Sequence, residues 1–116
     1  MTDSDTFRAA VAVCAATMLN SDASPYESAL EILGLASGGV PADDGDEAPH
    51  ALASIWGELT DWVELRPAET EQAEEHMLTA AREWLATAGD RRAEHRHFAR
   101  WLHDVLGYER PTPPQP

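Results

Sequence analysis

The chain has 116 residues, 43% of them hydrophobic, and a formal net charge of −13 from 21 acidic and 8 basic residues. This length predicts one domain, and the hydrophobic content is sufficient for a core without a metal or a disulfide. Such a negative surface disfavours nucleic acid and anionic membranes, which are negatively charged themselves. The charge favours a protein partner that is basic, and solubility alone is the other explanation of it.

The cysteine count and the hydropathy pattern predict a cytoplasmic protein. Cys14 is the single cysteine, so the chain cannot form an internal disulfide. The first residues are acidic, and the longest apolar run, 9–19, is too short to span a membrane. All 8 basic residues are arginine and alanine is abundant, which is typical of GC-rich bacterial genomes.

The first predicted helix covers residues 5–20, with Ser4 or Asp5 as its N-cap. Its main apolar stripe consists of Phe7, Val11, Cys14 and Met18. Its other sides are mostly alanine, with Val13 and Leu19, which is more apolar surface than one side of a small bundle requires. We therefore predict a homodimer through residues 5–20.

A capping box of Ser24 and Glu27, with Pro25 at the first helical position, predicts the start of a second helix. A Gly-Gly pair ends it, and residues 37–49 are predicted to form a mobile acidic loop. The acids of this loop lack the spacing of a calcium-binding loop, so we expect them to be solvated or to contact a partner. They are Asp43, Asp44, Asp46 and Glu47.

The stretch from Leu52 to Arg66 has the strongest helical pattern in the chain. Its apolar residues recur at helical spacing and form one stripe: Leu52, Ile55, Trp56, Leu59, Trp62 and Val63. A tryptophan can bury about 150–250 Å². We therefore expect this helix to be the one on which the other helices pack.

Two further helices complete the predicted bundle. The fourth begins at Pro67 and stops before Gly89, with an apolar stripe of Ala73, Met77, Ala80, Ala81, Trp84 and Ala88. Asp90 caps the fifth, which ends near Leu106 and has a core face of Phe98, Trp101, Leu102, Val105 and Leu106. Residues 1–110 are thus predicted to form a single all-α bundle domain, and residues 111–116 a disordered Pro-rich tail.

Glu94 and His97 have the i, i+3 spacing that is found in di-iron bundles. Such a site needs two of these motifs and two further glutamates, so we favour a solvated or helix-pairing role and expect no metal or cofactor. The chain has no phosphate-binding loop or nucleophile motif, and most of its acids lie opposite the apolar stripes. The alternative is a bundle that binds a small molecule or a metal, or an enzyme, with its site near Glu94, His95 and Trp101.

One basic stripe is predicted on the fifth helix. It consists of Arg92, Arg96, Arg100 and His103. Pairing with acids of a neighbouring helix explains it, and contact with an acidic partner or an anionic ligand is the alternative. In size, helical class and acidity the chain is similar to immunity and antitoxin proteins that cover basic nucleases, a likeness of type that transfers no residues. The sequence therefore predicts a non-enzymatic protein-interaction module.

Overall fold

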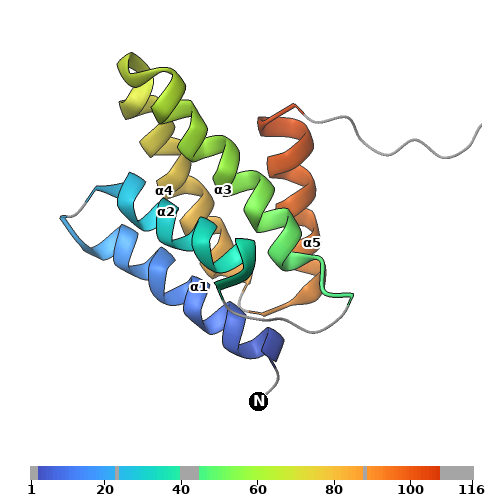
Figure 1. Cartoon of the computed structure of the whole chain (residues 1–116). Helices are drawn as coiled ribbons and strands as arrows, with labels where there is room; N and C mark the ends of the chain where they lie inside the picture. Colours follow the sequence, from blue (N-terminus) through green and yellow to red (C-terminus); the bar gives the residue numbers. More distant parts are fainter. Residues whose placement is uncertain (1–2, 23, 40–44, 88, 108–116) are drawn as a thin grey trace, which may run out of the picture.

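A computed structural model describes residues 3–22, 24–39, 45–87 and 89–107. Over these residues the chain is all-α, as predicted, and no strand occurs in them. The helices are α1 (Asp3–Asn20), α2 (Pro25–Gly34), α3 (Ala48–Leu65), α4 (Thr70–Thr87) and α5 (Arg91–Ala99) (Figure 1). Two short π-helical turns extend α2 and α5, and a 3₁₀ turn precedes α4: η1 (Leu35–Gly39), η3 (Arg100–Val105) and η2 (Pro67–Glu69). The predictions for Asp43, Asp44, Ala88 and the tail 111–116 fall outside the described residues.

Helix α3 lies in the middle of the bundle and packs against α2, α4 and α5 (Figure 1). Four residues of its predicted apolar stripe are buried, Leu52, Ile55, Trp56 and Leu59, and Trp56 is only 1% exposed, whereas Trp62 and Val63 are partly buried. Helix α1 instead packs mainly on α2 and α4. Three of the other four helices therefore pack on the 52–66 stretch. Helix α1 packs on α2 and α4, on the side of these helices that is away from α3.

The buried side of α1 differs by one position from the predicted stripe. The residues in the core are Phe7, Val11, Ala15 and Met18. Cys14 is only partly buried, and its Sγ lies 3.6 Å from a carboxylate oxygen of Glu31 on α2. Val13 is 65% exposed, so apolar surface of α1 does remain outside the core.

Local signals in the sequence place the helix ends well. Asp90 is the N-cap of α5 and accepts hydrogen bonds from two backbone N–H groups of the first turn, at 2.9 and 3.3 Å. Gly89, with φ of +80°, makes the left-handed turn that ends α4. Ser24 is the N-cap of α2, but its hydroxyl donates to Glu74 at 3.0 Å instead of closing a capping box with Glu27. The predicted position was right and the predicted contact was wrong.

Candidate functional site

Three charged side chains that are far apart in the sequence meet in one buried ion cluster. Arg8 of α1 donates through Nε and Nη2 to Glu94 of α5, at 2.7 and 2.8 Å. It also donates through Nη1 and Nη2 to Asp46, at 2.7 and 2.9 Å. The side chains of Arg8, Asp46 and Glu94 are 11%, 3% and 2% exposed. Bidentate pairing of this kind is among the strongest polar contacts in proteins, and here it joins α1 and α5 to the start of α3.

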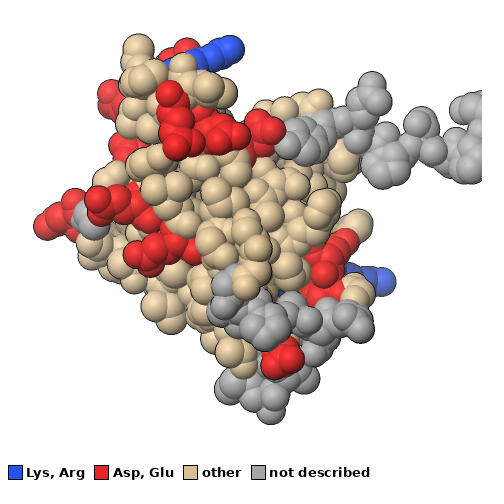
Figure 2. Space-filling view, viewed as in Figure 1, with Lys and Arg blue, Asp and Glu red and all other residues tan. Residues whose placement is uncertain are grey.

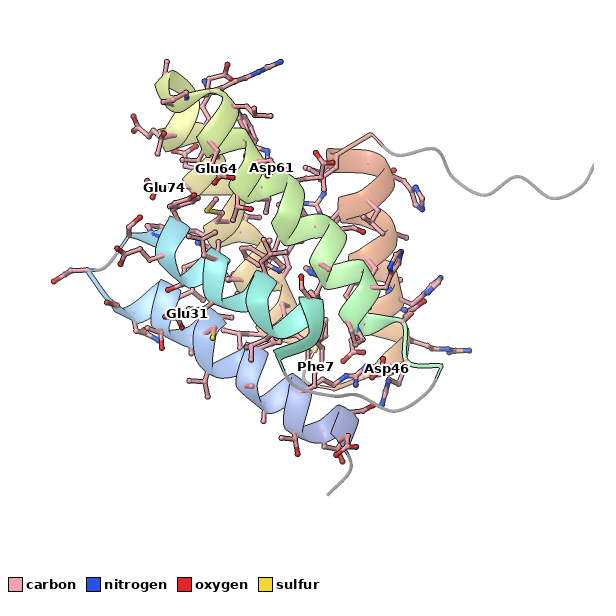
Figure 3. The ribbon with its side chains drawn as sticks, viewed as in Figure 1. Phe7, Glu31, Asp46, Asp61, Glu64 and Glu74 are labelled. Atoms are coloured by element: carbon pink, nitrogen blue, oxygen red, sulfur yellow. The ribbon has the colours of Figure 1, made fainter. Side chains whose placement is uncertain are left out.

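Asp46 has more hydrogen-bond partners than the other two members of the ion cluster. Besides Arg8, it accepts hydrogen bonds from the backbone N–H of Ala48 at 3.0 Å, from Arg91 at 3.3 Å and from the Ser4 hydroxyl. The Arg8 guanidinium holds the pKa of Asp46 well below its usual range, and this effect outweighs the burial that would raise it. Asp46 therefore stays ionised while it anchors the first turn of α3 (Figure 3).

The ion cluster corrects two sequence predictions. Asp46 was expected in a solvated loop, but its side chain is enclosed because its charge is matched by that of Arg8. Ser4 or Asp5 was expected to cap the first helix, but α1 begins at Asp3 and Ser4 is 1% exposed. The hydroxyl of Ser4 donates a hydrogen bond to Asp46 instead of capping its own helix.

A groove opens beside the ion cluster, between the start of α3 and the pair α5–η3. Its volume is about 490 Å³, which is within the usual range of about 300–1,000 Å³ for ligand sites. Its lining combines three histidines and one glutamate with apolar side chains: Glu47, His50, Ala51, His95, Phe98, Ala99, Leu102 and His103. We call this feature the histidine groove.

The ion cluster positions one end of the histidine groove. Glu47 follows Asp46 in the chain, and His95 follows Glu94. Nδ1 of His95 and a carboxylate oxygen of Glu47 lie 3.0 Å apart, although both side chains are more than half exposed. Since Arg8 binds the neighbour of each residue, Asp46 and Glu94, the two side chains are in contact at one end of the groove.

A second hollow, of about 250 Å³, lies further along α3. It is lined by Glu58, Asp61, Trp62, Leu65, Arg66 and Leu106. The indole N–H of Trp62 donates to Glu69 at 3.0 Å, and its ring packs edge-on against His76, with centroids 5.2 Å apart. We call this feature the Trp62 hollow, and its aromatic wall is fixed by both contacts.

On another side of α5, His97 is buried among aromatic rings. Its side chain is 3% exposed, and neither ring nitrogen has a hydrogen-bond partner among the described residues. The ring centroids of Trp84, Phe98 and Trp101 lie 6.0, 5.8 and 6.4 Å from that of His97. Burial lowers the pKa of His97 to about 4, although Glu83 at 3.8 Å acts in the opposite direction. His97 is therefore neutral at pH 7.

Glu83 of α4 is the acid that holds this side of α5. It accepts hydrogen bonds from Arg100, the shortest at 2.9 Å, and from the indole N–H of Trp101 at 2.6 Å. Burial alone would raise the pKa of Glu83. These hydrogen bonds and the Arg100 charge together outweigh burial, so the net shift of the pKa is downward. Arg100 thus pairs with an acid of the neighbouring helix, as the pairing explanation of the basic stripe expects.

The structure divides the predicted basic stripe between two sides of α5. Arg96 and Arg100 line a hollow of about 260 Å³ beside α4, whereas His103 lines the histidine groove beside α3. Arg92 is exposed. The cause is the π-helical turn η3, in which each residue rotates by less than the 100° of an α-helix. This turn moves His103 away from the line of the arginines.

The residues of the alternative ligand site do not converge. Glu94 contacts α1, His95 contacts the residue before α3, and Trp101 donates to α4. Glu94 and His97 are both buried and have different neighbours, which agrees with the helix-pairing role and not with the solvated one. Within the described ranges, no group of three His, Cys, Asp or Glu side chains is placed to hold a metal ion.

Exposed acids gather over α2 and α3, and we call this surface the acidic face. Its members are Glu27, Glu31, Glu58, Asp61 and Glu64. The described part of residues 25–65 contains no arginine, and in Figure 2 the arginines appear only at the margins of this view. Asp61 and Glu64 of α3 and Glu74 of α4 are labelled in Figure 3. Partial burial and these two α3 carboxylates raise the pKa of Tyr26, whose hydroxyl donates to Glu64.

Comparisons of the chain with protein-family models, with curated proteins and with solved structures find no match. Among the helices of the described ranges, none has the length and apolar character needed to cross a bilayer. Function is therefore inferred from the geometry and the charge of the described residues.

Proposed function

We propose that this chain is a helical protein-interaction module that binds a basic protein through the acidic face. One observation carries the proposal, the separation of charge within the bundle. The acidic face holds five exposed carboxylates without an arginine among them, while Arg8 is bound to Asp46 and Glu94 inside the molecule and Arg100 is bound to Glu83 at the surface beside α4. The negative field over α2 and α3 is therefore available to steer and orient a partner of opposite charge.

The test compares two variants with the same net charge. The first removes three carboxylates of the acidic face through Glu27→Gln, Asp61→Asn and Glu64→Gln. The control removes three exposed carboxylates elsewhere through Asp3→Asn, Glu71→Gln and Glu75→Gln. The probe is a nona-arginine peptide, and its Kd is measured at 50 and 150 mM salt.

We expect the acidic-face variant to lose at least tenfold more affinity than the control, because a clustered field acts on a partner more strongly than dispersed charge. The difference should shrink at the higher salt, since the Debye length falls to about 8 Å at 0.15 M. Equal losses in the two variants would mean that only the total charge matters, and the acidic face would then have no special role.

Self-association through residues 5–20 is a second proposal, and one observation supports it. Val13 of α1 is 65% exposed, and an apolar side chain at that position can meet its own copy across a two-fold axis. We expect light scattering at physiological salt to give the mass of two chains, and expect Val13→Glu to reduce that mass to one. A mass of one chain for the unmodified protein at high concentration would contradict the dimer.

A further inference from the structure

The histidine groove and the Trp62 hollow belong to one surface. The residues of α3 that line them lie at positions 50, 51, 58, 61, 62 and 65, which share one stripe of the helix about 120° wide, and Glu47 precedes the helix on the same side. On its other side the groove is bounded by Phe98 of α5 and Leu102 of η3, and the hollow is bounded by Leu106, which directly follows η3. We call this surface the α3–α5 seam.

The floor of the α3–α5 seam is apolar and well supported. Phe98 is 3% exposed, and Trp62 is backed by His76, which in turn packs on Trp101 with ring centroids 6.0 Å apart. Leu65, at the end of α3, is 79% exposed. In protein interfaces, anchor residues usually bind in preformed hollows that aromatic and aliphatic side chains line.

The rim of the seam on the α3 side is acidic. Glu47, Glu58 and Asp61 are exposed along it, and Arg66 stands at its far end. An apolar floor beside a row of carboxylates is complementary to a segment that carries apolar residues on one face and cations next to them. Such a segment is an amphipathic basic helix laid in a groove between two helices.

The length of the seam and the spacing of its two hollows agree with a bound helix. The stretch from residue 47, directly before α3, to residue 65 at its end covers 18 steps of about 1.5 Å, or about 27 Å. The α3 residues of the two hollows are centred about 12 residues apart, so the hollows are separated by about 18 Å. A helix of about 18 residues would cover the seam and place one apolar residue in each hollow.

We infer that the α3–α5 seam binds an amphipathic basic helix, whose two apolar anchors, about 11 residues or three helical turns apart, enter the histidine groove and the Trp62 hollow. The inference rests on the proposed function, since it assigns the basic partner a binding element and a place. It adds that affinity depends on apolar anchors as well as on charge.

The test uses the full chain and two synthetic 20-residue peptides. The first is a helical peptide rich in arginine, with leucines at positions 4, 5, 15 and 16. The second has serines in place of those leucines and the same charge. Titration calorimetry gives the Kd at 150 mM salt, and backbone NMR shifts locate the binding surface. We expect the leucine peptide to bind at least tenfold more tightly and to shift signals on α3 and α5.

Matched variants of the chain test the surface itself. Ala99→Trp fills the histidine groove, and Ala86→Trp places the same side chain at an exposed position on α4. We expect Ala99→Trp to weaken the leucine peptide tenfold or more and Ala86→Trp to leave its Kd within twofold. Circular dichroism confirms that both variants are folded.

Each other result overturns the inference in a recognisable way. Equal affinity for the two peptides would show that charge alone binds, so the anchors would be refuted while the basic partner stands. Shifts confined to α1 or to the α2 side of the acidic face would place the helix elsewhere. Absence of binding by both peptides, even at 50 mM salt, would refute the proposed function together with the seam.

Discussion

Glu94 and His97 are three residues apart on α5, and both are almost fully buried, yet their surroundings are opposite. Glu94 is held by two hydrogen bonds from Arg8. His97 has no hydrogen-bond partner among the described residues and is surrounded by aromatic rings. A carboxylate can be buried as an ion only beside a cation, whereas an imidazole can be buried alone because it can lose its proton.

The largest expected effect on stability comes from removing Arg8, the cation that binds Glu94. Arg8→Ala leaves two buried carboxylates without their cation and should lower the free energy of unfolding by about 3–5 kcal/mol. That is a large part of the about 5–15 kcal/mol that a domain possesses. Urea unfolding measures the loss.

Arg91→Ala is the matched control, because Arg91 contacts the same Asp46 at 3.3 Å but is 59% exposed. It should cost only about 0–1 kcal/mol. Similar losses for the two variants would mean that the ion cluster is open to water and adds little to stability.

Unfolding at acidic pH tests His97, the neutral residue of this comparison. Burial lowers the pKa of His97 from 6.5 to about 4, so the folded state binds fewer protons than the unfolded state. The free energy of unfolding is therefore unaffected by this group above pH 6.5 and falls by about 3 kcal/mol as the pH falls towards 4. Unfolding measured at pH 7 and pH 4 should show a decrease smaller by about this amount in His97→Leu. Asp46 also loses stability in acid, and it does so equally in both proteins, so an identical decrease would contradict the assignment to His97.

At pH 7 the same His97→Leu variant should be slightly more stable than the unmodified chain, by about 1 kcal/mol. A buried polar group without a partner costs about 1–3 kcal/mol, and leucine removes that cost at a small loss of ring packing. Thermal unfolding at pH 7 measures the change. A loss of more than about 1 kcal/mol would show that the ring nitrogens do have a partner.

The smallest effect is expected from Arg100, whose side chain is 50% exposed despite its contacts with Glu83. Arg100→Met should change the free energy of unfolding by about 0–1 kcal/mol, because an exposed ion pair is screened by water. Denaturant unfolding at 0.05 and 0.5 M salt checks this. A loss as large as that of Arg8→Ala would mean that exposure does not separate the two arginines.

The helices could be predicted from the sequence because their signals are local. Pro25, Gly89 and Asp90 act on the residues next to them, and the apolar stripes need only the period of the helix. The acidic face follows from the same period, since Glu58, Asp61 and Glu64 lie opposite the stripe of α3.

The buried polar sites could not be predicted in this way, because periodicity tells which side of a helix is buried and not which helix covers it. The contact between Arg8 and Glu94 spans 86 residues. One signal did exist. Arg8 is the only basic residue before Arg66, and Glu94 lies near the predicted core face of its helix, so each needed a partner of opposite charge. The groove and the hollow also depend on how α3 and α5 lie beside each other, which no local pattern specifies.

The ion cluster also has a consequence for the order in which the protein is made. Arg8 meets Asp46 across 38 residues and Glu94 across 86. At about 5–20 residues per second on the ribosome, Glu94 is synthesised roughly 4–17 s after Arg8. Until then α1 lacks one of its two carboxylate partners, and contacts of such long range are slow to form because the intervening chain must close first. Helix α1 therefore completes its contacts only after α5 has been made.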